Sequence, residues 1–285
     1  MSTVVTARRF VSLVKLEHTV FALPFAYVGA ILAAGDVPSA ATLAWVTVAM
    51  VGARSLAMAL NRLIDSEIDA RNPRTAAREL PSGLLSRAQV VLFCLGSLGV
   101  FLIAAWQLDP VVRWLWPIPV LAFVLYPYTK RFTWLCHLAL GLSTGLAPLG
   151  AWLAVSGDAD PAPFLLWWAV ALWIGGFDII YATMDLEIDR AQGLHSIPRR
   201  FGVATALRIT RAFHLASVLL LVWLGIALGL GPLYYLGVAV VAALLAYENS
   251  IVSADDLSRV DMAFLTMNGV IALVFLAGVL ADVVT

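Results

Sequence analysis

Long apolar stretches separated by short polar ones follow one another along nearly the whole chain. A hydrocarbon core about 30 Å thick needs roughly 20 apolar residues per helix. Each stretch is close to that length, which predicts nine transmembrane helices and an all-α integral membrane fold within a single domain, residues 1–285. The predicted spans are 17–34, 40–61, 88–107, 112–129, 134–155, 163–182, 210–229, 231–248 and 260–282.

The composition supports this prediction. Of the 285 residues, 62% are hydrophobic and 13% are charged, and the mean hydropathy is +0.92. A soluble globular domain contains about 25% charged residues, so the expected solvent is a lipid bilayer. The net charge of zero gives no reason to expect a nucleic-acid partner, and nothing in the pattern predicts an oligomeric state.

The basic residues are distributed unevenly between the predicted loops. With nine spans, successive loops alternate between the two sides of the membrane. Apart from Arg54 and Arg113, every Lys and Arg falls on the side of the N-terminus. The positive-inside rule therefore predicts a multi-pass protein of the cell membrane with these loops in the cytoplasm: 62–87, 130–133, 183–211 and 249–259.

Two segments, 61–83 and 178–202, interrupt the apolar pattern in the same way. Each contains the sequence D-x-E-I-D at the end of a predicted span, and each continues into a basic loop with Pro and Gly. These shared features indicate an internal pseudo-repeat. Ionisable residues next to hydrocarbon are costly, and they usually mark a functional site.

The acidic residues of both segments are spaced for metal binding. Four residues turn an α-helix by about 400°, so Asn61, Asp65 and Asp69 share one face, and Asp185 and Asp189 share another. Like charges at this spacing destabilise a helix unless a cation lies between them. Carboxylate and amide oxygens without His or Cys suit Mg²⁺, which typically binds a few carboxylates together with substrate phosphates.

Basic residues close to the two acidic clusters would suit a diphosphate held between bridging metal ions. An alternative is that these acids and bases pair with one another at a solvated rim. Glu67 and Glu187 are turned about 200° away from the Asp faces, so we expect them to be solvated. The candidate diphosphate-binding residues are Arg54, Arg74, Arg78, Lys130 and Arg131.

These motifs resemble those of the UbiA family of intramembrane prenyltransferases, and the resemblance covers nearly the whole chain. The pattern N-x-x-x-D-x-x-x-D starts at Asn61, and D-x-x-Y-x-x-x-D-x-x-x-D starts at Asp178 and includes Tyr181. Between them, the Y-P-x-x-K-R loop ends at Lys130 and Arg131.

The resemblance implies a nine-helix bundle around a central cavity with a cytoplasmic cap. It also implies that Mg²⁺ and a prenyl diphosphate bind at the Asp motifs, with Asp178 and Tyr181 as catalytic residues. Metal-assisted ionisation of the allylic C–O bond would precede attack by an electron-rich aromatic ring. A dry pocket would protect the carbocation from water.

The aromatic acid acceptor is expected to depend on His137 and His195. Relatives acting on 4-hydroxybenzoate are expected to carry Gln and Lys at these positions. Stretches such as GLHSIP and APLGAW look instead like the branch associated with the futalosine route to menaquinone. We therefore expect a dihydroxynaphthoate acceptor, with 4-hydroxybenzoate, the ubiquinone precursor, as the alternative.

Two other classes of membrane protein share some of these features. An ion-coupled transporter also combines intramembrane carboxylates with a repeat, but its polar groups should lie at mid-bilayer, whereas these collect at helix ends. A CDP-alcohol phosphotransferase also has Asp-rich metal sites. Its compact D-G-x-x-A-R pattern is absent from the sequence.

Overall fold

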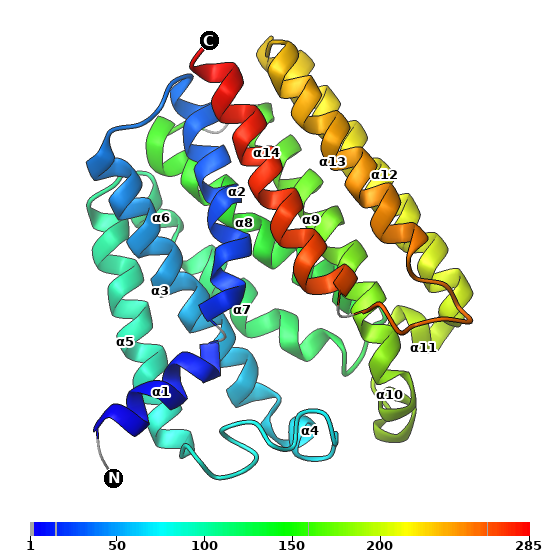
Figure 1. The fold of residues 1–285 in the computed structure, drawn as a ribbon. Helices are drawn as coiled ribbons and strands as arrows, with labels where there is room; N and C mark the ends of the chain where they lie inside the picture. The colour runs from blue at the N-terminus through cyan, green and yellow to red at the C-terminus, as the bar shows by residue number, and fades with distance from the viewer. Residues whose placement is uncertain (1–2, 15, 159, 261) are drawn as a thin grey trace.

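The computed structural model describes residues 3–14, 16–158, 160–260 and 262–285. Throughout these ranges the regular structure is helical and contains no strand. The long helices lie side by side in a bundle, and several short helices gather at the end of the bundle opposite the C-terminus (Figure 1). The all-α fold predicted from the sequence is confirmed.

Apart from α1, which was not predicted from the sequence, the bundle is built from long helices that match the predicted apolar segments. These helices are long apolar runs with few charges. A helix pairs its backbone N–H and C=O groups internally, as the interior of a bilayer requires. The helices of more than ten residues are α1 Thr3–Val14, α2 Leu16–Ala34, α3 Ala40–Ile64, α5 Arg87–Trp106, α7 Pro117–Thr129, α8 Cys136–Ser156, α9 Pro161–Ala182, α12 Val203–Leu228, α13 Pro232–Ser250 and α14 Asn268–Val283.

Short helical segments connect the long ones, and three of them gather at one end of the molecule (Figure 1). The short segments are α4 Ser66–Ala70, α6 Val112–Leu115, the 3₁₀ turn η1 Thr183–Asp185, α10 Leu186–Gln192, α11 Ile197–Phe201 and the π-helix η2 Met262–Met267. Helices α4, α10 and α11 lie at the end where α3 and α9 finish (Figure 1).

Six helical stretches in the described chain are long and apolar enough to cross a membrane. They are Ala40–Ile64, Arg87–Trp106, Cys136–Ser156, Pro161–Gln192, Val203–Leu228 and Pro232–Ser250. The other three predicted spans coincide with α2, with α6 and α7, and with η2 and α14. A multi-pass membrane protein is therefore supported, while the count of nine spans and the cytoplasmic side of the cap stay predictions.

Two of these three predicted spans are not single continuous α-helices. The segment 112–129 breaks between α6 and α7 at Trp116 because Pro117 and Pro119 lack a backbone N–H and favour a helix start. The segment 260–282 begins with the π-helix η2 before α14 continues from Asn268. Periodicity of apolar residues does not reveal such breaks.

The largest hydrophobic core lies between α2, α8, α9, α12, α13 and α14. Trp173, Tyr234 and Phe275 are its largest fully buried side chains. The ring of Phe25 meets the Trp173 indole edge to face, with centroids 4.7 Å apart. In contrast, large apolar side chains such as Leu92, Leu215 and Ile226 are 61–70% exposed on outward faces. Lipid would cover them.

Glycine permits backbone contact between neighbouring helices on both sides of α8. A Cβ atom at Gly141 would lie 2.0 Å from the carbonyl oxygen of Ala171 on α9, and one at Gly29 would lie 2.2 Å from that of Pro148. Small residues allow this close approach in membrane bundles. The positions of α2 and α9 against α8 therefore depend on these two glycines.

We predict that Gly141→Ala lowers the melting temperature in detergent, because the added methyl group separates α8 from α9 at a cost of about 1–3 kcal/mol. Gly150→Ala on the same helix is the matched control, since nothing lies within 4 Å of its Cβ position. That control should keep or slightly raise the melting temperature through helix propensity. Equal melting temperatures of the two variants would contradict the packing argument.

Candidate functional site

The first aspartate of each D-x-E-I-D motif lies at the same kind of break in its helix. Asp65 follows α3 with φ −94° and ψ 5°, and Asp185 precedes α10 with φ −98° and ψ 5°. Both values fall in the sparsely populated bridge region. The backbone N–H of Asp65 still bonds to the carbonyl of Asn61 at 2.9 Å, so the predicted common face is kept. The pseudo-repeat therefore extends to backbone conformation.

Asp65 is surrounded by donors although it is only 2% exposed. Its Oδ2 accepts hydrogen bonds from Lys130 Nζ at 2.6 Å and Asn61 Nδ2 at 3.0 Å, and Arg131 Nη2 lies 3.2 Å from Oδ1. Burial raises the pKa of the Asp65 carboxyl, whereas Lys130 and Arg131 oppose that rise. The short loop after α7 thus brings two cations onto the first acidic segment.

Asp69 is bound by a cation from its own following loop. Both of its carboxylate oxygens accept from Arg78 Nη1, at 2.7 and 2.8 Å. Arg62 lies farther away, with Nη1 3.9 Å from Asp69 Oδ2. The loop 71–86 therefore folds back against the end of α3 and brings Arg78 to the cluster.

Arg74 connects the first segment to the second. Its guanidinium donates to both carboxylate oxygens of Asp185, through Nε at 3.1 Å and through Nη2, and Nη1 donates to the Tyr181 hydroxyl at 2.8 Å. Asn72 Nδ2 also donates to Asp185 at 3.0 Å. Sequence reasoning missed Asn72, although its place before Pro73 in a turn next to Arg74 was a usable signal.

The remaining acidic side chains, Glu67, Glu187 and Asp189, differ in exposure as the helical geometry predicts. The Glu67 and Glu187 side chains are 80% and 79% exposed, which confirms that they point away from the Asp faces. Asp189 is half-buried close to Ser196, Asp185 and Lys130. The two acidic segments therefore lie together at one end of the bundle and share cations from two loops.

His137 is buried behind Asp178 and lines neither of the two cavities described below. Its Nδ1 lies 2.7 Å from Asp178 Oδ2, and its Nε2 lies 3.3 Å from the backbone N–H of Ile197. Because that N–H can only donate, Nε2 is the acceptor and Nδ1 carries the proton given to Asp178. The imidazole orients this carboxylate.

His195 takes part in the site through its main chain. Its N–H donates to the carbonyl of Lys130 at 2.7 Å, and its carbonyl accepts the Cys136 thiol at 3.3 Å. The loop before α11 is thereby attached to the loop after α7. An acceptor-binding role for His137 and His195 stays a prediction, and the contacts described here give both residues positions outside the cavity walls.

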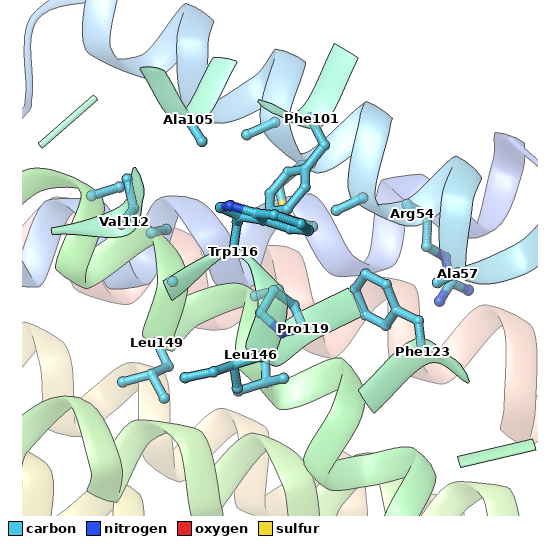
Figure 2. A pocket seen from close by; sticks show the side chains of 18 of the residues that line it. Arg54, Ala57, Phe101, Ala105, Val112, Trp116, Pro119, Phe123, Leu146 and Leu149 are labelled. Atoms are coloured by element: carbon cyan, nitrogen blue, oxygen red, sulfur yellow. The ribbon is translucent and has the colours of Figure 1, made fainter. Parts of the chain in front are cut away.

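A mostly apolar cavity of about 180 Å³ lies between α3, α5, α6, α7 and α8. Arg54 and Tyr126 are among its few polar lining residues. Figure 2 shows Arg54 and Val112 on opposite sides of the Trp116 indole, which lies near Phe101 and Pro119. Arg54 therefore brings one charged group to a cavity whose wall is otherwise mostly apolar.

A smaller cavity of about 110 Å³ shares its wall with the first. Arg54, Leu140 and Thr144 line both, so the two cavities meet at these residues. The smaller cavity is also lined by Asp178 and by the aromatic side chains of Phe25, Trp173 and Phe177. Arg54 forms no ion pair with any carboxylate of the described residues, and its Nε has no hydrogen-bond partner.

The donor set at the helix ends suits Mg²⁺ bound together with a phosphate group. No three His, Cys, Asp or Glu side chains within the described ranges form a ready-made cage. Mg²⁺ usually takes one or two carboxylates and completes its shell with water and phosphate oxygens. Asp65 Oδ1 is buried without a hydrogen bond. The carboxylates of Asp69 and Asp185 offer further oxygen atoms that could ligate a metal ion.

Comparison with known proteins gives a consistent result. The model of the UbiA prenyltransferase family matches residues 22–277. The 4-hydroxybenzoate octaprenyltransferase of Vibrio cholerae is 31% identical to this chain over 285 residues, which is 99% of each protein. The similarity therefore extends over both acidic segments and the loops between them.

Solved structures share the fold. A UbiA homolog from Aeropyrum pernix K1, determined in its apo form, has a TM-score of 0.85 and 34% identity, covering 93% of this chain and 98% of that one. A UbiA homolog from Archaeoglobus fulgidus, bound to DMAPP and Mg²⁺, has a TM-score of 0.73 at 20% identity, covering 97% and 99%.

We predict that His137→Leu lowers the melting temperature in detergent. The change leaves the Asp178 carboxylate and the Ile197 N–H without their partner, at a cost of about 1–3 kcal/mol for a buried polar group. His137→Gln, which keeps a donor and an acceptor, should lose less. Unchanged stability of His137→Leu would show that the pair contributes nothing to the folded state.

Proposed function

Because the chain belongs to the UbiA prenyltransferase family, we propose that this prenyltransferase transfers a polyprenyl group from its diphosphate to 4-hydroxybenzoate. The observation that carries the proposal is that two Asp segments are cross-linked, that the second lines the smaller cavity through Asp178, and that this cavity shares a wall with a larger, mostly apolar one. An anionic head and a hydrocarbon tail require such a combination. The family assignment also removes the support for an ion-coupled transporter.

The choice of acceptor follows the relatives. The Vibrio cholerae protein, similar over its whole length, is named for 4-hydroxybenzoate. This preference replaces the dihydroxynaphthoate expected from the sequence, which rested on His137 and His195. Since both histidines make structural contacts away from the cavity walls, they give little reason to expect a wider bicyclic acceptor.

The diphosphate is assigned to the helix ends. Mg²⁺ would be held by Asn61, Asp65, Asp69, Asp185 and Asp189. The Archaeoglobus fulgidus homolog binds Mg²⁺ together with DMAPP. The metal would neutralise negative charge on the leaving group. The carboxylates are now neutralised by four basic side chains, Arg74, Arg78, Lys130 and Arg131. In the complex these side chains would donate charge-assisted hydrogen bonds to the phosphate oxygens. Tyr181 holds Arg74 beside them.

The prenyl tail is assigned to the larger cavity and the acceptor to the smaller one. Arg54 lies seven residues before Asn61 on α3, about 10 Å deeper along the helix, so we assign it to the acceptor in place of the diphosphate expected from the sequence. Its free guanidinium at the junction of the cavities suits the acceptor carboxylate instead.

The chemistry proposed for the junction needs few protein groups. The allylic C–O bond breaks and its electron pair leaves with the diphosphate, after which a ring carbon of the acceptor forms the new C–C bond and loses a proton. Asp178, held by His137 in the smaller cavity, is placed to accept a proton from the acceptor. The apolar walls exclude water from the carbocation.

The orientation in the membrane is part of the proposal. The basic loops and both Asp segments lie on one end of the bundle, and the positive-inside rule assigns that end to the cytoplasm. Prenyl diphosphate and 4-hydroxybenzoate would then be collected from the cytoplasmic side of the bacterial-type cell membrane, with the tail remaining in lipid.

We predict that Asp65→Asn and Asp185→Asn each reduce prenyl transfer at least about 100-fold, because each removes a metal-binding charge. The assay is transfer of radiolabelled prenyl diphosphate in detergent, with EDTA abolishing the reaction and Mg²⁺ restoring it. Glu67→Gln is the matched control, since its carboxylate is exposed and should be dispensable. Wild-type turnover of either Asp variant would eliminate the metal-clamp model.

We predict that 4-hydroxybenzoate is used with a kcat/KM at least about tenfold above that of a dihydroxynaphthoate, which corresponds to about 1.4 kcal/mol. Arg54→Met should lower kcat/KM for acids more than for a phenol lacking the carboxylate. Competition between the two acceptors in one reaction measures the ratio directly. A preference for the naphthoate would reverse the acceptor assignment and leave prenyl transfer itself intact.

A further inference from the structure

One face of α12 points away from the rest of the bundle along most of its length. The helix lies at the edge of the bundle, beside α13 (Figure 1). Residues three or four positions apart share a helical face, and the outward face of α12 consists of Arg208, Arg211, Leu215, Leu219, Trp223 and Ile226. The four apolar side chains are 59–67% exposed. Two exposed arginines are therefore followed by a continuous apolar stripe.

The opposite face of α12 is attached to α9 by two buried hydroxyl groups. Thr210 Oγ1 donates to the carbonyl of Gly176 at 3.1 Å, and Ser217 Oγ donates to the carbonyl of Ala169 at 2.7 Å. Both side chains are buried. Because these bonds fix the rotation of α12 about its own axis, the arginines and the apolar stripe are held outward.

The two arginines lie at the level expected for lipid headgroups. Leu228, the last residue of α12, follows Arg208 by 20 residues, a rise of about 30 Å along a helix, which matches the thickness of a hydrocarbon core. Just before α12, the rings of Phe201 and Trp134 meet edge to face with centroids 5.1 Å apart. Aromatic rings are enriched at the membrane–water interface. The stripe therefore lies in hydrocarbon and the guanidinium groups at its boundary.

The two guanidinium groups keep most of their donors and have no acidic partner. Arg208 Nε donates to the carbonyl of Ala204 at 3.4 Å, and Arg211 Nη2 donates to the carbonyl of Asn249 on α13 at 3.5 Å. A guanidinium group has five N–H donors. Neither arginine forms an ion pair with a carboxylate in the ranges that the structure describes. The pair thus presents uncompensated positive charge next to the lipid-facing stripe.

We propose that this face of α12 binds an anionic phospholipid, with its phosphate between Arg208 and Arg211 and an acyl chain along the stripe that begins at Leu215. Residues three apart are neighbours on a helix surface, and arginine donors match phosphate oxygens. A zwitterionic lipid carries a cation that opposes this contact, and inorganic phosphate has no chain for the stripe. Since Arg211 also touches α13, the bound lipid stabilises the packing of α12 and α13.

The test measures the melting temperature of the full-length protein in detergent with added phosphatidylglycerol, phosphatidylcholine or inorganic phosphate. A ligand that binds only the folded state raises this temperature. We expect phosphatidylglycerol to raise it at least about 3 °C more than phosphatidylcholine, and phosphate to leave it unchanged. An equal rise with phosphatidylcholine would overturn the headgroup assignment, and an equal rise with phosphate would show a site for a free anion.

The double variant Arg208→Gln/Arg211→Gln locates the effect. Both side chains are exposed, so the variant should fold, and it should keep less than about a third of the gain from phosphatidylglycerol because the charge-assisted contacts are lost. Native mass spectrometry should show phosphatidylglycerol retained on wild type and lost from this variant. A full gain or full retention in the variant would refute the site.

Arg87→Gln/Arg190→Gln is the charge-matched control, because each of these exposed arginines already has a glutamate nearby. Arg87 Nη2 lies 3.9 Å from Glu67 Oε1, and Arg190 Nη1 lies 2.8 Å from Glu187 Oε1. The control should keep the full gain, measured for each protein with and without lipid. A loss as large as that of the α12 variant would show a general effect of net charge. The readout involves neither substrate, so it is independent of the proposed reaction.

Discussion

The pairing of carboxylates with cations at the edge of an apolar bundle is the constraint on which the rest of the structure depends. Asp65, Asp69 and Asp185 each lie where burial makes an unpaired charge expensive, and each receives a cation from a loop: Lys130, Arg78 and Arg74 respectively. Because these cations come from two loops, Arg74 and Arg78 from 71–86 and Lys130 from the loop after α7, satisfying the acids also decides how the loops fold over the helix ends. The positions of these loops are thus a consequence of charge neutralisation.

In the proposed reaction, a metal-bound diphosphate has to replace the ion pairs that these carboxylates and basic side chains now form with each other. A metal diphosphate brings positive charge for the carboxylates and negative charge for the basic side chains, so each group exchanges one partner for another of the same sign. Such an exchange avoids exposing an uncompensated charge at any stage. The bidentate contact of Arg74 with Asp185 also means that the loop 71–86 and the second Asp segment respond together, although they belong to different halves of the pseudo-repeat.

Much of this arrangement could be predicted from the sequence because the relevant signals are local. Long apolar runs identify the helices, and four-residue spacing places Asp65 and Asp69 on one face and turns Glu67 away. Other features depend on contacts between distant segments, which periodicity does not encode. The bond from His137 to Asp178 spans 41 positions, and Asn72 reaches Asp185 across 113. The division of one apolar segment at Pro117 shows a further limit, since a span-length run does not exclude a break within it.

The glycine contacts have a mechanical consequence. At Gly29 and Gly141 the backbone of α8 lies directly against α2 and α9, and at Gly52 a Cβ atom would lie 2.6 Å from the backbone nitrogen of Phe101 on α5. Main chain in such contact leaves no side-chain layer to compress, so the walls of the larger cavity that α2, α3, α5 and α8 form are stiff. Helices α6 and α7, which are separate rods joined next to Pro117, form the compliant wall. A bulky isoprenoid entering or leaving sideways would therefore displace this pair in preference to the others.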